Sequence, residues 1–402
     1  MGQSPALRAL QTTTFKRVLT IGLFYYTYRA TELAVLSWYV LTLTSSDLMV
    51  ALVGVSRIGP MFVFGLVAGG LADRFVRKQL MVAVQLANLV SAAAMALVLV
   101  LGFDAYWFAY IAIGITGTTW TVDYAARRAL LGDLFKGAQL TTATSMDAGL
   151  VTGSNMIGPL IGTAMVRYSD FAGAYLGIVG LSMSAFALVA TIKVSSQQNR
   201  VTNAGPKRHI SDALSMMRHN RVVLGAVLLT SAFNIFGWPF VQLVPVVATE
   251  SFGASEIAYG LLISGLGAGA IVGSVLIATV QPSRKGDIYS LGAALFMVSE
   301  LCFVFAPWYW LAFGCMFIAG VGLAGFAAMQ PVIPLESVKS DERGKAMGAV
   351  ALGIGAQAPG MLVMGIVSEV LGPTISIALA ATMGLLFIVI LRRLFPALCS
   401  KP

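Results

Sequence analysis

Two oppositely charged residues, Arg29 and Glu32, lie close together inside a long apolar stretch of the chain. They are three residues apart, so in a helix their side chains project from the same face. A lone charge at the centre of a bilayer costs about 2.5–3.5 kcal/mol on insertion scales. An ion pair beside a wet cavity reduces this cost. The pair predicts either a carboxylate that titrates during function or a static contact that fixes helix packing. We favour the first, because ionisable residues within membranes are functional by default.

Two further charged residues fall in other apolar stretches. Arg57 could share Glu32 with Arg29 or bind an anionic substrate, and an arginine would be an anchor because it stays charged at physiological pH. Asp147 is either a second protonation site or a partner of the adjacent Arg127–Arg128 pair. We predict that a central cavity for proton coupling contains Glu32, Arg29, Arg57 and Asp147, with Glu32 as the first candidate for the proton carrier.

Several polar and aromatic residues inside the apolar stretches are candidates for substrate binding. Asn155 follows Asp147 by eight residues, which places both on a similar helix face. The stretch near Trp238 contains Pro239 and Pro245, and proline-interrupted helices often line a cavity. The alternative for each candidate is simple packing, and we expect Glu300 to be peripheral. The predicted substrate-binding residues are Tyr25, Tyr28, Asn155, Asn234, Trp238, Gln242, Gln330 and Gln357.

The elements that position these residues must be membrane helices. Only 11% of the residues are charged and 58% are hydrophobic, whereas soluble proteins carry about 25% charged residues. A span needs about 20 apolar residues. That length predicts an all-α integral membrane protein with twelve transmembrane helices. The predicted helices cover 18–42, 47–70, 79–102, 105–125, 138–166, 172–193, 222–249, 256–280, 287–305, 307–330, 345–369 and 372–393.

The lysine and arginine residues predict the orientation, because basic residues collect in cytoplasmic loops. With the N-terminus inside, the outer loops hold only Arg167, and Arg29 and Arg57 lie within spans. All other basic residues then fall in inner segments, so we predict an N-in, C-in topology. The predicted organisation is a cytoplasmic arm at 1–17, a six-helix bundle at 18–194, a cytoplasmic linker at 195–220, a second six-helix bundle at 221–394 and a cytoplasmic tail at 395–402.

A charged stretch separates the second and third predicted helices. It reads Gly69-Gly-Leu-Ala-Asp73-Arg74-Phe-Val-Arg77-Lys78. The two predicted bundles also contain similar segments. Residues 149–162 and 348–360 are both rich in glycine, contain a proline and follow a basic inner loop. A weak repeat between two six-helix halves is typical of transporters.

These motifs resemble those of the major facilitator superfamily. Residues 69–78 are similar to its G-x-L-a-D-r-x-G-r-k loop signature, with Val76 in place of the usual glycine. Residues 149–162 resemble the fifth-helix signature of its antiporters, which ends in G-P-x-x-G. At 71–78, 126–134 and 341–345 the chain is similar to the transmembrane secretion effector group, whose relatives include drug–proton antiporters like the enterobactin exporter. Many drug–proton antiporters carry an arginine embedded in the span that corresponds to 105–125, and this chain has none there. The chain therefore lacks one residue of the usual proton-coupling scheme of those antiporters.

The resemblance implies a gate. It suggests that Asp123 pairs with Arg77 and that Asp73 faces the start of the eleventh helix near Gly344, where the helix dipole favours a carboxylate by about 0.3–1 kcal/mol. We predict that this set holds the two halves together on the inner side. On the outer side, Gly158 and Pro159 are expected to kink the fifth helix, pack tightly and discourage leak. The predicted gating residues are Gly69, Asp73, Arg74, Arg77, Lys78, Asp123, Gly158 and Pro159.

The sequence therefore predicts a secondary transporter that works by alternating access. Without a Gly-x-x-x-x-Gly-Lys loop, energy is expected from an ion gradient or from the solute. We expect proton-coupled efflux of a small drug- or siderophore-like compound by a monomer in the bacterial inner membrane. Three cysteines and two histidines show no metal-site spacing, and the scattered basic residues argue against nucleic-acid binding. We expect no enzyme activity, metal or cofactor. The alternatives are an importer or facilitator of a small anionic metabolite or lipid, and a receptor or scaffold without flux.

Overall fold

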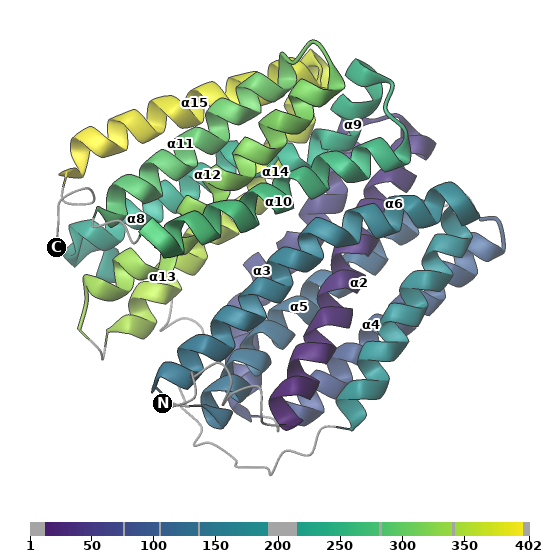
Figure 1. Ribbon diagram of the computed structural model, residues 1–402, viewed down its shortest axis with the longest axis horizontal. Helices are drawn as coiled ribbons and strands as arrows, with labels where there is room; N and C mark the ends of the chain where they lie inside the picture. Colours follow the sequence, from purple (N-terminus) through teal and green to yellow (C-terminus); the bar gives the residue numbers. More distant parts are fainter. Residues whose placement is uncertain are drawn as a thin grey trace. The chain divides into compact units, whose positions relative to one another are not determined.

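The computed structural model describes residues 13–74, 77–103, 106–135, 137–191, 215–280, 284–339 and 342–396. Every regular element within these ranges is a helix (Figure 1). The helices are α2 (Thr13–Thr44), α3 (Asp47–Arg74), α4 (Arg77–Val100), α5 (Trp107–Leu134), α6 (Gly137–Ala190), α8 (Arg221–Ala232), the π-helical η1 (Phe233–Gly237), α9 (Phe240–Phe252), α10 (Glu256–Val280), α11 (Lys285–Val304), α12 (Tyr309–Glu336), α13 (Arg343–Gly355), α14 (Gln357–Leu371) and α15 (Pro373–Leu394).

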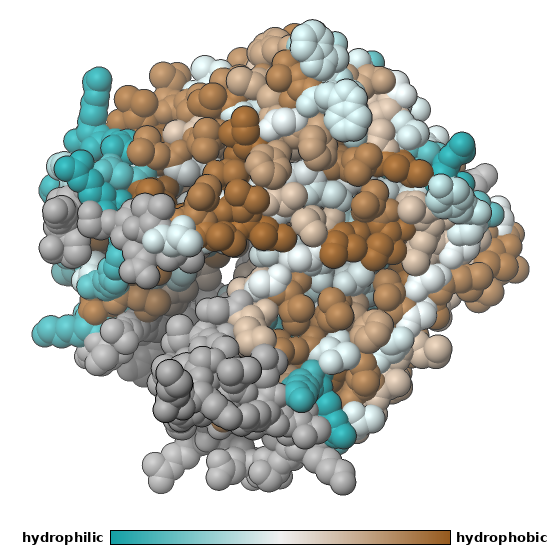
Figure 2. All heavy atoms as spheres, viewed as in Figure 1, coloured by the Kyte–Doolittle hydropathy of each residue, from teal (hydrophilic) through white to brown (hydrophobic). Residues whose placement is uncertain are grey.

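The helices have the length and composition of membrane spans. Within the described residues, eight are long and apolar enough to cross a membrane. Their outer faces carry large apolar side chains, as on α15, where Leu379, Met383, Leu386 and Ile390 are all about half exposed. Such side chains dominate the visible face in Figure 2. A stripe of this kind faces lipid in a membrane and would be a liability in water. The prediction of an integral, multi-pass membrane protein is confirmed.

Most helix ends agree with the predicted ones, and the local chemistry explains why. The long helix α6 leaves helical geometry at Ser169 and Asp170, between the predicted spans 138–166 and 172–193. Asp170 adopts a left-handed φ of 61°, and its carboxylate accepts a hydrogen bond of 2.9 Å from the backbone of Gly173. Gly372, at φ 83°, and Pro373 separate α14 from α15. Glycine tolerates this backbone, and proline suits the first helical turn.

Two predicted spans are interrupted. The predicted helix 222–249 becomes α8, η1 and α9, and the backbone N–H of Trp238 bonds the carbonyl oxygen of Phe233 at 2.9 Å, five residues earlier. The predicted helix 345–369 becomes α13 and α14, which meet at Ala356. A proline follows each break, Pro239 and Pro359. Because proline has no N–H, one bond of the regular α-helical ladder is missing at each place.

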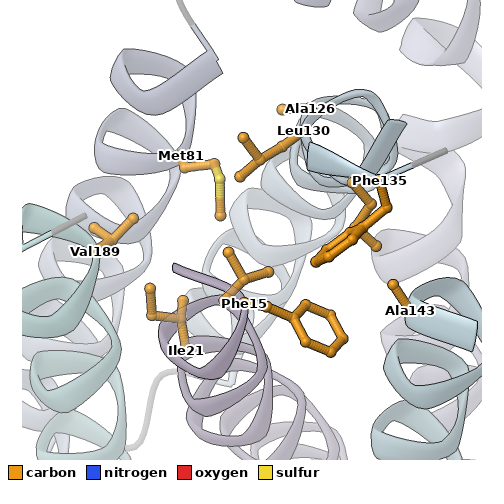
Figure 3. Packing of buried hydrophobic residues seen from close by; sticks show 10 residues of the cluster. Phe15, Ile21, Met81, Ala126, Leu130, Phe135, Ala143 and Val189 are labelled. Atoms are coloured by element: carbon orange, nitrogen blue, oxygen red, sulfur yellow. The ribbon is translucent and has the colours of Figure 1, made fainter. Parts of the chain in front are cut away.

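The chain forms two compact units, residues 1–39 with 59–203, and residues 40–58 with 204–402. In the first unit, apolar side chains of α2, α4, α5 and α6 form one core (Figure 3). Phe15 lies at its centre and meets Phe135 edge-on, with 5.0 Å between ring centroids. This core fixes the orientation of α2, which carries the charged residues Arg29 and Glu32.

The second unit packs through glycine. A Cβ atom at Gly320 of α12 would lie 2.0 Å from the carbonyl oxygen of Leu266 in α10. On the neighbouring side of α12, Gly322 approaches Gly292 of α11 so closely that a Cβ at either position would lie 2.7 Å from the other's carbonyl oxygen. Small residues allow such backbone contact between membrane helices. The start of α3 belongs to this unit, where Gln242 donates to the carbonyl oxygen of Val50 at 3.2 Å.

Candidate functional site

The candidate site of the first unit is built on helix α2. Polar side chains of this helix are buried between residues 25 and 32, among them Tyr25, Tyr26, Tyr28, Arg29 and Glu32. Glu32 has no exposed surface and Arg29 is 8% exposed. Burial of polar groups is costly unless they are bonded, so the neighbours of these side chains decide what the site can do.

Glu32 lies between two tyrosines. Its Oε1 atom accepts a hydrogen bond of 3.1 Å from the hydroxyl of Tyr28, one turn earlier on α2, and one of 3.4 Å from Tyr175 of α6. The Tyr28 hydroxyl also lies 3.1 Å from Oγ1 of Thr116 in α5. Three helices therefore meet at this carboxyl group. Because both hydrogen bonds come from other side chains, any movement of α2 against α6 changes the contacts of this carboxyl group.

Arg29 lies over an aromatic ring. The central carbon of its guanidinium is 3.7 Å from the ring centroid of Trp120 in α5 and 5.8 Å from that of Tyr25. A desolvated cation over a tryptophan face is stabilised by about 2 kcal/mol or more. This contact keeps a positive charge in the apolar interior of the first unit, one turn from Glu32.

A second polar group lies nearer the start of α2. Arg127 and Asp123 of α5 form a forked ion pair with N–O distances of 2.9 and 3.3 Å, and both are buried. Arg127 also donates to the carbonyl oxygen of Val18 at 3.2 Å. Asp147 of α6 accepts hydrogen bonds of 2.9 and 3.0 Å from the Tyr26 hydroxyl. The sequence had placed Arg127 in an inner loop, but α5 continues to Leu134 and buries it.

Sequence reasoning missed a polar row on α4. Gln85, Asn88 and Ser91 are all buried at three-residue spacing, and Oδ1 of Asn88 accepts a hydrogen bond of 2.6 Å from Thr119. Thr119 belongs to α5, the helix that also carries Trp120. Polar residues three apart within an apolar stretch share one helix face, and that spacing is the signal that could have revealed them. Trp120 and Tyr175 had no such signal.

The polar candidates in the second unit lie on several helices. Asn234 lies in η1 and donates to the carbonyl oxygen of Thr230 at 2.9 Å. Trp238 stacks on Phe296, with 6.2 Å between ring centroids. Gln242 and Gln357 are buried, whereas Gln330 and Arg57 are half-buried. Asn155, in the first unit, is exposed. The structure thus brings together the candidates on α2, while the substrate-binding role of the others stays a prediction.

The predicted gate is only partly described. The surroundings of Gly69, Asp73, Arg74 and Arg77 lie outside what the structure describes, so the expected Asp123–Arg77 pair stays a prediction. Lys78 is half-buried. The observed partner of Asp123 is Arg127. A Cβ at Gly158 would lie 2.5 Å from that of Ala30, so α6 and α2 touch closely inside the first unit, and Pro159 follows within the helix. The tight packing is observed, and the role between the halves stays a prediction.

Comparison with known proteins places these features in context. Residues 5–399 match the model of a family described as transmembrane secretion effectors. The chain is 25% identical to the staphyloferrin A transporter of Staphylococcus aureus over 84% of this chain and 85% of that protein. It is 20% identical to macrolide efflux protein A of Streptococcus pyogenes over 77% of each chain.

Solved structures with the same fold are also transporters. A POT family transporter in complex with a thioalcohol-conjugated peptide has a TM-score of 0.80 and 10% identity over 96% of both chains. The nucleoside transporter NupG has a TM-score of 0.74 and 14% identity, covering 96% of this chain and 99% of that one. A bacterial homologue of the lysosomal transporter Spinster has a TM-score of 0.73 and 11% identity, covering 97% of this chain and 98% of that one. At these identities the likeness concerns the fold alone.

Proposed function

The chain belongs to the transmembrane secretion effector family of major facilitator transporters, and we propose that it exports a small organic compound across the bacterial inner membrane in exchange for protons. The cycle we propose is alternating access by twelve spans with both termini inside. The curated relatives are named for a siderophore and for macrolides, which supports a drug- or siderophore-like substrate.

Glu32 is the proposed proton carrier. The observation that carries this proposal is a carboxyl group with no exposed surface that receives hydrogen bonds from tyrosines of two helices. A proton on Glu32 weakens the bonds from Tyr28 and Tyr175, because a neutral acid accepts hydrogen bonds less strongly than a carboxylate. Protonation would thereby loosen the contact between α2 and the second half of α6, which is the kind of local change that can bias a conformational equilibrium.

Arg29 is the proposed partner of the substrate. Its charge is held against Trp120 at 3.7 Å and lies one turn from Glu32. An anionic or aromatic group of a substrate would be attracted to this cation and indole, and its arrival would change the electrostatic field at Glu32. Substrate and proton could then compete through one electrostatic site, as antiport requires.

The experiment uses the full chain in proteoliposomes with an imposed pH gradient, and a macrolide and staphyloferrin A as probes. Wild-type protein should move a probe against its gradient when the pH gradient is present. Glu32→Gln should abolish this coupled movement while it keeps the thermal stability and elution of the wild type. Glu250→Gln is the control, because Glu250 is exposed at the end of α9. Wild-type pH dependence in Glu32→Gln would exclude Glu32 as the carrier.

The buried cation of Arg29 also favours a second candidate, an importer or facilitator of a small anionic metabolite or lipid. In that case, inward flux would follow the substrate gradient and would not require a pH gradient. Arg29→Lys should then weaken binding, because lysine loses the forked geometry with which arginine holds an anion. Tight binding of a ligand without any counterflow would instead indicate a receptor.

A further inference from the structure

A second carboxyl group is buried in the other unit. Glu300 lies in the last two turns of α11 and has no exposed surface. Neither of its carboxyl oxygens has a hydrogen-bond partner among the residues that the structure describes. The sequence had suggested a position at the periphery of the fold, which stays a prediction, and within its unit the side chain is completely buried. Its chemistry therefore depends on which side chains enclose it.

Aromatic rings surround this turn of α11. Phe296 lies one turn before Glu300 and Phe303 nearly one turn after it. Phe240 of α9 meets both, with ring centroids 5.4 Å from Phe296 and 5.8 Å from Phe303, so it lies across the turn that carries the carboxyl group. Trp238 stacks on the far side of this cluster, against Phe296. The three phenylalanine rings carry no hydrogen-bond donor, and the indole N–H of Trp238 is the one donor among these four side chains.

The charged groups of the neighbouring helices are engaged elsewhere. Arg392 of α15 binds Asp287 at 2.6 Å, and Lys285 binds Glu336 of α12 at 2.5 Å. Both pairs involve the first turn of α11, about 20 Å along the helix from Glu300. Other titratable groups on the elements packed around α11 are Tyr309 and Cys315 of α12, Arg393 of α15 and Glu250 of α9, with Tyr289 and Cys302 on α11 itself. None of these groups is bonded to Glu300.

An ionised carboxylate in such a place would have neither a counter-charge nor a donor. The cost of burying an isolated charge is so large that a carboxyl group takes up a proton instead. We propose that Glu300 is a second proton-binding site, occupied in this conformation, in the unit that does not contain Glu32. The proton is retained while Phe240, Phe296 and Phe303 exclude water, and it can leave only when a movement of α9 or α11 admits water. This inference does not depend on the direction of transport or on the role of Glu32.

Infrared spectroscopy tests the proposal directly. The spectrum of Glu300→Gln is subtracted from that of the wild type, both measured on the purified full chain at neutral pH. The difference should contain a C=O stretching band of a protonated carboxylic acid, and the carboxylate bands of the two proteins should be equal. The proposal would be overturned if the variant lacked a carboxylate band of the wild type and the difference spectrum contained no protonated-acid band. Because glutamine has nearly the shape of the neutral acid, the variant should also melt at the wild-type temperature, whereas a large fall would indicate an ionised, bonded Glu300.

Chemical labelling of the wild-type protein needs no variant. Dicyclohexylcarbodiimide adds a protonated carboxyl group across one C=N bond, and the acyl group then migrates to nitrogen to give a stable acylurea. At pH 7.5 an ordinary exposed glutamate is protonated in only about one molecule in a thousand. Peptide mass spectrometry should therefore find Glu300 labelled far more than Glu336, which is 48% exposed and ion-paired. Equal labelling of the two would count against a retained proton.

Discussion

Replacement of Gly320 by alanine should destabilise the second unit, because this glycine lies where the backbones of α12 and α10 touch. The new Cβ would lie 2.0 Å from the carbonyl oxygen of Leu266, 2.7 Å from the amide nitrogen of Ala270 and 2.9 Å from the Cα of Gly269. All three are backbone atoms, so no side chain can turn away to make room. The two helices must move apart, and such overpacking costs about 1–3 kcal/mol or more.

Gly314 provides a matched control on the same helix. No atom outside its own helix lies within 4 Å of a Cβ placed there. Alanine favours a helix over glycine by up to about 1 kcal/mol. Gly314→Ala should therefore leave stability unchanged or raise it, whereas the same change at Gly320 should lower it. The gain in helix propensity is common to both variants, so the expected difference between them is the overpacking cost, about 1–3 kcal/mol.

The assay is thermal unfolding of the full chain in one detergent, followed by loss of the monodisperse peak. One kcal/mol moves the midpoint by roughly 2–4 °C for a domain of 150–250 residues, so several degrees should separate Gly320→Ala from Gly314→Ala. Gly269→Ala should resemble Gly320→Ala, since its Cβ would lie 1.8 Å from the carbonyl oxygen of Phe317. If Gly320→Ala melts with or above Gly314→Ala, α10 and α12 do not touch as described.

Two further predictions concern the first unit. Tyr175→Phe removes one hydrogen bond to Glu32, which costs the carboxylate form about 1.5–3 kcal/mol; the midpoint of the pH–transport profile should therefore move to higher pH, and an unmoved midpoint would show that Tyr175 does not act on Glu32. Asp123→Leu leaves Arg127 buried without its partner and should cost about 3–5 kcal/mol. The double variant Asp123→Leu with Arg127→Met should recover most of this loss in the melting assay, and equal instability of single and double variants would contradict the pairing.

The helices themselves could be predicted because their signal is local. A run of apolar residues must bond its own backbone in a bilayer, so length and composition are enough to place a span. The break at Ser169–Asp170 and the boundary at Gly372–Pro373 fell between predicted spans for this reason. Pro239 and Pro245 had marked the helix near Trp238 as one that proline interrupts. The break at Ala356 was not predicted, although Pro359 follows it, because proline is also tolerated in continuous membrane helices.

The partners of the buried charges could not be predicted in the same way. Spacing alone placed Arg29 and Glu32 on one helix face, but it could not show that Trp120 lies against Arg29 or that Tyr28 and Tyr175 bind Glu32. Tyr175 is 143 residues from Glu32, and nothing in its own neighbourhood marks it as polar lining. Glu300 illustrates the same limit, since its complete burial could not be read from its position on α11.

Local features of the amino-acid sequence are enough to identify this chain as a helical membrane transporter of a recognisable family. Hydrophobic length, basic residues and short loop motifs are read along the chain and do not require contacts. Such local features do not show which polar groups meet, because that depends on the rotation and separation of helices distant in sequence. These are set by contacts such as Gly158 on Ala30 and Phe15 on Phe135, where packing fixes the face that each helix turns toward its neighbour.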